Sequence, residues 1–83
     1  MTIGDSVRRI LAEELELEEI DNKQRLLGEL VKYRIDYANL CLAVEEKTGI
    51  RLSPDKMLAI QKGTVGDFVH EVTEAHKEGR NAR

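Results

Sequence analysis

The sequence predicts an all-α protein: a bundle of three main helices and one short helix, with a long first loop. Three observations support this prediction. Apolar residues recur every three or four positions in three separate segments, which is the period of an amphipathic helix. Turn and helix-ending signals separate these segments, and no segment has a convincing strand pattern. The 83 residues are 41% hydrophobic and 35% charged, which is ordinary for a single globular domain spanning residues 1–83.

The first helix is expected at residues 5–17, where Asp5 or Ser6 would cap the free amide groups at its start. Its apolar face consists of Val7, Ile10, Leu11 and Leu15. The dipeptide Asp21-Asn22 then indicates a turn. Residues 24–33 are expected to form a long loop with a helical turn, held to the core by Leu26, Leu27 and Leu30.

The second main helix is expected at residues 35–47, and Gly49 suits the left-handed position that ends many helices. Its apolar stripe consists of Ile35, Ala38, Cys41 and Leu42, widened by Leu40 and Val44. We therefore expect this helix to be buried on more than half of its circumference, with Leu42 in the core.

Two more helices are expected after an extended connector at residues 50–55. Ser53-Pro54 is typical of a cap and a first helical residue, here of a short helix at 54–60 buried through Met57, Leu58 and Ile60. Thr64, with an acid three residues later, matches a capping arrangement for the last helix, at 65–78. That helix presents an apolar face of Val65, Phe68, Val69, Val72 and Ala75. The expected core is Leu11, Leu15, Leu42, Val44, Phe68 and Val72.

Charge and composition limit the classes of partner. The net charge is −3 and the sequence pI is about 5.4, so the chain lacks the basic surface that nucleic-acid binding needs. An acidic protein suits partners with basic surfaces. Cys41 is the single cysteine, which fits a reducing compartment. The sequence has no secretory signal pattern and no apolar run long enough for a membrane helix. We expect a cytoplasmic protein with no membrane partner.

Three segments together resemble the acyl carrier protein family. Residues 41–52 (CLAVEEKTGIRL) are similar to that family's V-M-A-L-E-E-E-F-G-I-x-I, at the exit of its second helix. Residues 64–69 (TVGDFV) are similar to its T-V-G-D-L-V, and residues 7–15 to its first helix. With a two-residue deletion near Glu18 and a two-residue insertion near Lys62, the resemblance covers almost the whole chain in the order of the family. The resemblance implies an acyl-carrier-protein-like bundle of three main helices plus one short helix.

The resemblance fails at the position that carries the prosthetic group. The family has D-S-L-D at the head of its second helix, and the serine there bears 4′-phosphopantetheine. This chain has Tyr33-Arg34-Ile35-Asp36 instead, and no Ser or Thr occurs between Lys23 and Lys47. A guanidinium has no hydroxyl and stays protonated, so Arg34 cannot form the phosphodiester. We expect no attached cofactor.

Other candidate chemistry is weak. Cys41 lies between leucines without a neighbouring base, so a small core residue is favoured over a nucleophile. His70 and His76 are six residues apart rather than the four that would place two ligands on one helix face. We therefore expect no catalytic residue, no metal site and no enzyme activity.

The remaining expectation is a protein-docking surface on the second helix. Members of the acyl carrier family present acidic residues there to basic patches of synthases, ligases or transferases. Carried over by position, the docking residues are Tyr33, Arg34, Asp36, Asn39, Glu45 and Glu46. The preferred interpretation is a carrier-like binding module without the prosthetic arm, which docks to or regulates fatty-acid, polyketide or peptide-synthesis enzymes. Two alternatives stay open: a carrier with an unusual attachment or a non-covalent ligand, and a generic helical adaptor.

Overall fold

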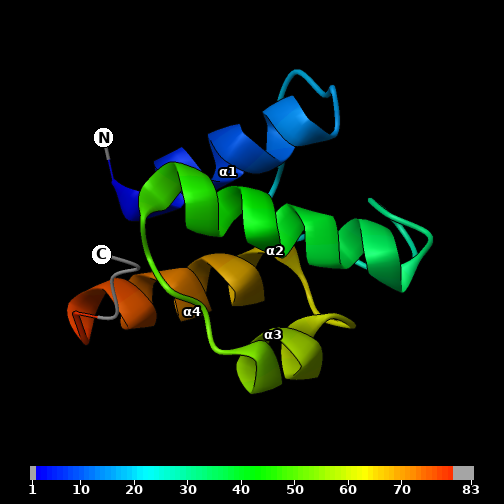
Figure 1. The fold of residues 1–83 in the computed structure, drawn as a ribbon. Coiled ribbons are helices and arrows are strands. Elements are labelled where there is room, and N and C mark those ends of the chain that lie inside the picture. The colour runs from blue at the N-terminus through cyan, green and yellow to red at the C-terminus, as the bar shows by residue number, and fades with distance from the viewer. Residues whose placement is uncertain (1, 80–83) are drawn as a thin grey trace.

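In the computed structural model, which describes residues 2–79, those residues form four helices and no strand (Figure 1). The helices are α1 (Ile3–Glu14), α2 (Arg34–Thr48), α3 (Pro54–Ile60) and α4 (Val65–Lys77). This confirms the expected all-α bundle with one short helix and a long first loop. The bounds of α3 are as expected, α2 is longer than expected by one residue at each end, and α4 ends one residue early.

Helix α1 begins two residues earlier and ends three residues earlier than expected. Thr2 is its cap: the Thr2 hydroxyl accepts from the Asp5 amide at 3.1 Å, and the Asp5 carboxylate accepts from the Thr2 amide at 3.3 Å. Asp5 therefore completes a capping box from inside the helix, and neither Asp5 nor Ser6 is the cap itself. The helix ends because Glu16 adopts a left-handed conformation at φ 57°. Leu15 is only partly buried.

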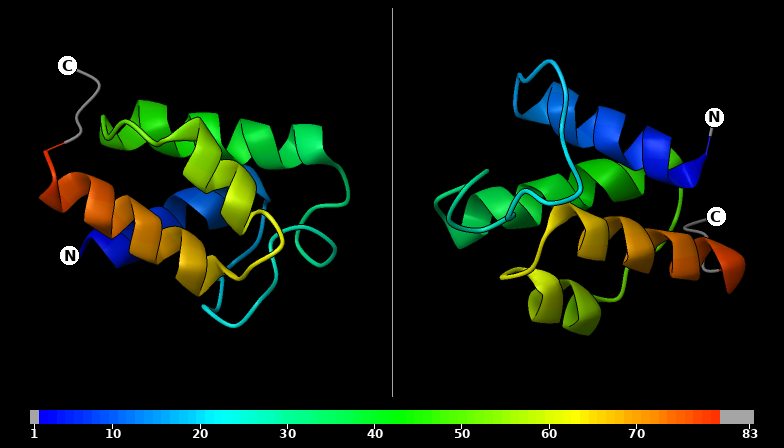
Figure 2. Two further views of the ribbon diagram at one scale, coloured as in Figure 1. Left: turned by 90° about the horizontal axis from the view of Figure 1, so that it is seen from below. Right: turned by 180° about the vertical axis from the view of Figure 1, so that it is seen from behind.

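The core joins all four helices and the first loop. Helix α1 packs against both α2 and α4, and α3 packs against α4. The right view in Figure 2 shows α1 and α2 above α4 and α3 below it, whereas in the left view, from below, α3 lies in front of the space between α2 and α4. The largest fully buried side chains are Phe68, Leu11, Leu26, Ile50, Val7, Val44, Val65 and Val72. Leu11, Val44, Phe68 and Val72 therefore occupy the core as expected, and Leu26 holds the loop to it.

The orientation of α2 corrects the sequence-based prediction. The buried face consists of Tyr37, Leu40 and Val44, while Ile35 and Leu42 are 70% and 54% exposed. Both sets have helical spacing and lie on opposite faces, so periodicity alone could not choose between them. Tyr37 decides the choice, because its hydroxyl donates to the carbonyl oxygen of Met57 at 2.6 Å in the interior. Leu42 is therefore not a core residue.

Leu58 is a second correction. It is 60% exposed, while its neighbour Met57 is buried and Ile60 is partly buried. A helix of seven residues has only two turns, and successive residues point about 100° apart, so burying Met57 turns Leu58 outward.

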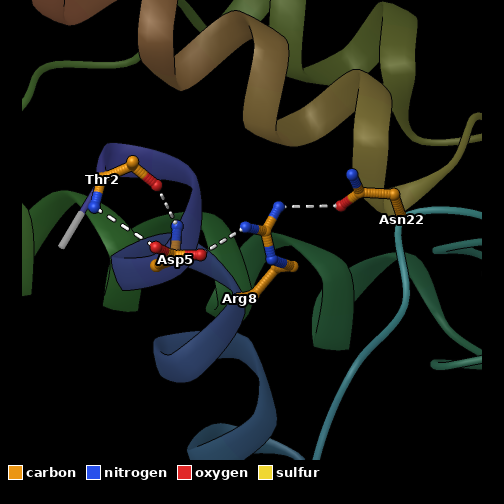
Figure 3. A network of polar contacts seen from close by, with 4 residues as sticks. All are labelled: Thr2, Asp5, Arg8 and Asn22. Carbon is orange, nitrogen blue, oxygen red and sulfur yellow. Dashed lines mark hydrogen bonds and ion pairs between the residues drawn. The ribbon is translucent and has the colours of Figure 1, made fainter.

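The first loop is paired with the linker between α3 and α4 and with the first two residues of α4. The amide of Leu26 donates to the Gly63 carbonyl at 3.0 Å, and the amides of Val65 and Gly66 donate to Gln24 and Asn22 at 2.9 Å. Figure 3 shows the second attachment of this loop: the Arg8 guanidinium bridges the Asp5 carboxylate at 2.7 Å and the Asn22 side-chain oxygen at 3.0 Å. These bonds fix the loop that leads into α2.

Candidate functional site

The head of α2 is exposed and carries a cation. Tyr33 is the cap residue, but no side chain caps the helix there, and Tyr33 is 65% exposed. Arg34 is the first helical residue and is exposed. No hydrogen bond or ion pair joins its guanidinium to the part of the chain that the structure describes. A cation at a helix N-terminus opposes the helix dipole, so α2 gains no electrostatic stability from Arg34.

The outward face of α2 is defined here by Ile35, Ala38, Asn39, Leu42 and Glu46, all of which are exposed. Helix α2 runs across the front of the molecule in Figure 1, with α1 behind it and α3 and α4 below. The face combines two large exposed apolar side chains with an acid at its C-terminal end. Exposed apolar side chains that lie together indicate an interaction surface more strongly than scattered ones do.

A groove of about 440 Å³ separates α2 from α3. Most of the side chains along it are apolar, and Arg34 lies at one end. Its lining is Arg34, Tyr37, Ala38, Cys41, Leu42, Glu45, Leu52, Pro54, Met57, Leu58 and Gln61. The exposed side chains of Leu42 and Leu58 therefore border a hollow rather than a flat surface, which is the geometry of many ligand and peptide sites.

The inner wall of the groove is held by Tyr37. Besides its hydrogen bond to Met57, its ring lies edge-to-face against Phe68 with centroids 6.3 Å apart. Burial raises the pKa of the Tyr37 hydroxyl above its ordinary value, so it stays a neutral donor. Burial likewise raises the pKa of the Cys41 thiol to about 11. Cys41 is therefore a protonated lining residue at neutral pH, and its position does not activate it as a nucleophile.

The residues predicted for docking lie on three sides of α2. Tyr33, Asp36 and Asn39 border a second hollow of about 420 Å³ on the side of α1. Arg34 and Glu45 lie on the side of α3, and Glu46 is on the outward face. Glu45 is half-buried, and its carboxylate accepts from the Leu52 amide at 2.7 Å. It thereby holds the connector between α2 and α3.

Sequence reasoning missed the apolar part of this surface. The apolar periodicity predicts that Ile35, Leu42 and Leu58 are buried, yet these side chains are exposed beside the predicted acids. The available signal was that α2 has apolar residues around most of its circumference, while a short bundle can cover only one side.

The described residues 2–79 contain no group of three or more His, Cys, Asp or Glu side chains that could hold a metal ion. Within the same range, none of the helices has the length and apolar character that crossing a membrane requires. No protein-family model, curated protein or solved structure gives a significant match to this chain.

Proposed function

We propose that this protein is a non-enzymatic docking module of the acyl-carrier type, which binds carrier-dependent enzymes through the outward face of α2. The observation that carries the proposal is the exposure of Ile35 and Leu42 beside Asp36 and Glu46. Apolar side chains at the centre of a contact supply most of its binding energy, and flanking charges steer a partner of opposite charge. The missing serine makes such a module a competitor of true carriers rather than one of them.

The first experiment tests docking with a broad-specificity phosphopantetheinyl transferase as the probe. The transfer of phosphopantetheine to a genuine acyl carrier protein is measured while this chain is added. We expect competitive inhibition that is lost in Ile35→Glu and Asp36→Lys. The matched control is Leu17→Glu, because Leu17 is, like Ile35, an exposed aliphatic residue but lies outside α2. Absence of inhibition by the wild-type chain would contradict the docking proposal.

The second experiment tests the carrier resemblance by restoring the attachment chemistry. Intact mass after incubation with coenzyme A and the same transferase should be unchanged for wild type. Arg34→Ser should be modified slowly, and Tyr33→Asp with Arg34→Ser faster, because an acidic helix head raises the encounter rate with a basic enzyme. A pantetheine mass on wild type would overturn the proposal. A double mutant that remains unmodified would favour the generic adaptor.

The groove between α2 and α3 favours a second candidate function, the non-covalent holding of an apolar ligand. Its apolar lining and its single cation, Arg34, suit a long-chain fatty acid with the carboxylate at the head of α2. Because Cys41 lines the groove and is the single cysteine, its alkylation rate reports occupancy. We expect added fatty acid to protect Cys41, and less so in Arg34→Gln. Equal alkylation with and without fatty acid would exclude this function.

A further inference from the structure

The charges on α2 are arranged so that its two ends complement each other. Arg34 stands at the first helical residue and Glu46 near the last turn, both exposed and both without a hydrogen bond or ion pair to the described residues. Between them Ile35, Ala38 and Leu42 follow one another at intervals of three and four residues, which places them in one row on a helix. The outward face is therefore apolar in the middle, with Glu46 at its C-terminal end and Arg34 at the edge of its N-terminal end, on the side of α3.

A second copy of the same helix, running in the opposite direction, fits this row. If the two helices cross between Ala38 and Asn39, Ile35 of each copy lies opposite Leu42 of the other. The small side chain of Ala38 lies at the crossing and permits close approach. Arg34 then lies level with Ala43 of the second copy along the helix axis, and Glu46 lies only three residues, or about 4.5 Å along the axis, further on. A guanidinium side chain spans that distance, so both charged ends can pair at once.

The alternative occupant, a uniformly basic partner surface, fits the row less well. Such a surface gains from Asp36 and Glu46 but meets Arg34 at the helix head. An antiparallel copy instead brings its own Glu46 near Arg34 and its own Arg34 near Glu46. It also opposes the two helix dipoles, which is favourable. A two-fold axis makes every such contact occur twice, which is the general property of isologous interfaces.

We propose that a second copy of this chain covers the outward face of α2 through an antiparallel α2–α2 contact. The inference concerns the surface on which the proposed docking function rests, and it assigns that surface a regulation: self-association and enzyme docking exclude each other. A single helix of 15 residues is about 22 Å long. An interface of this size belongs to the small, transient class, so the dimer dissociates on dilution and releases the docking face.

The test measures mass by sedimentation equilibrium over a wide range of protein concentrations, at low and high salt. Wild type should pass from monomer to dimer as concentration rises, and less so at high salt. Arg34→Glu and Glu46→Arg should each shift this transition to at least several-fold higher concentration, since each places like charges together. The two substitutions combined should restore it. Glu19→Arg, the same charge change at an exposed loop residue, should leave it unchanged.

Loss of folding cannot imitate these results. Arg34→Glu places an acid at the start of α2, and Glu46→Arg places a base near its end, so both improve the helix's own electrostatics. Within one copy the two residues are 12 positions apart, about 18 Å along the axis, so restoration by the double variant requires contact between copies. Ile35→Glu should also abolish the dimer with an unchanged helical circular dichroism spectrum, because Ile35 is mainly exposed.

Two results would overturn the inference. One is a wild-type chain that stays monomeric at every concentration, and the other is a double variant that associates no better than the single variants. Neither result touches the proposed docking function, because the transferase competition assay uses dilute, monomeric protein. A chain that dimerises but does not inhibit the transferase would support self-association through α2 and contradict the docking proposal.

Discussion

Individual residues in this protein take opposite roles within one helix. Leu40 and Leu42 are two positions apart in α2, yet Leu40 is buried and Leu42 is mainly exposed. Tyr37 sets this difference, since its hydroxyl reaches the Met57 carbonyl only when Leu40 and Val44 also face inward. A polar group on an aromatic ring needs a partner when it is buried. That partner is 20 residues away along the chain, so the periodicity of α2 by itself could not reveal it.

The first prediction uses these two leucines as a matched pair. Leu40→Ala should lower the free energy of unfolding by about 2–5 kcal/mol, the usual range for a truncation in the core. Leu42→Ala removes the same atoms from a surface position and should cost well under half as much. Urea unfolding of both variants checks the difference. If Leu42→Ala proved the more destabilising, the assigned orientation of α2 would be wrong.

The second prediction concerns the Cys41 thiol. Its pKa is raised to about 11 from an ordinary value of 9.0 because burial disfavours the thiolate. Below pH 9 the thiolate fraction is then roughly a hundredfold smaller than in an exposed cysteine. The iodoacetamide reaction rate should rise about tenfold per pH unit from pH 7 to 10 without levelling off. The urea-unfolded chain serves as control and should level off near pH 9. A plateau at pH 9 in the native protein would refute the burial of this thiol.

At the scale of helices, α1 and α4 begin in the same way, each with a threonine as the cap residue. Thr2 with Asp5 and Thr64 with Asp67 each form a reciprocal capping box. The sequence pattern identified the second box, and the bounds of α3 and α4 followed closely from it and from Ser53-Pro54. The first box has the same Thr-x-x-Asp spacing, which the expected cap at Asp5 or Ser6 does not use. The start of α1 was therefore available from the sequence, whereas the buried face of α2 was not.

The third prediction tests the cap of α4. Thr64→Ala leaves the Asp67 amide without its acceptor, and should lower the free energy of unfolding by about 0.5–2 kcal/mol. Thr73→Ala is the control on the same helix. The Thr73 hydroxyl donates to the Val69 carbonyl within the helix, a contact that adds little stability, so its loss should be nearly neutral. Thermal unfolding distinguishes the two, and equal losses would show that the capping box contributes nothing.

At the scale of the whole molecule, the first loop acts as a structural element. Its leucines were expected to hold it to the core, and Leu26 does so completely. The sequence did not indicate its partner, because the pairing joins Leu26 to the linker and Gln24 to the start of α4, some 40 residues later, through backbone groups alone. Backbone hydrogen bonds between distant irregular segments leave no periodic pattern in side chains. The candidate site is limited in the same way. Its acids can be predicted from the sequence, but the exposure of its apolar centre depends on how α2 packs against the other helices.

The fourth prediction follows from this pairing. Leu26→Ala should cost about 2–5 kcal/mol although the residue lies in a loop, because its side chain is fully buried. Hydrogen exchange should accelerate together at the amides of Leu26, Val65 and Gly66, which bond across the pairing. If only the Leu26 amide exchanged faster, the loop and the linker would be independent.

The closeness of the first and last helical turns has a consequence for how the chain can be cut. Ile3 and His76 border the same hollow, and the start of α1 and the end of α4 lie at one end of the molecule in every view (Figures 1 and 2). Glu18 and Glu19 are exposed, and their backbone groups make none of the loop's long-range hydrogen bonds. A circular permutant that joins the end of α4 to the start of α1 through a flexible linker and opens between Glu18 and Glu19 would thus retain all four helices. Its new first helix would be α2, which would then emerge from the ribosome ahead of α1.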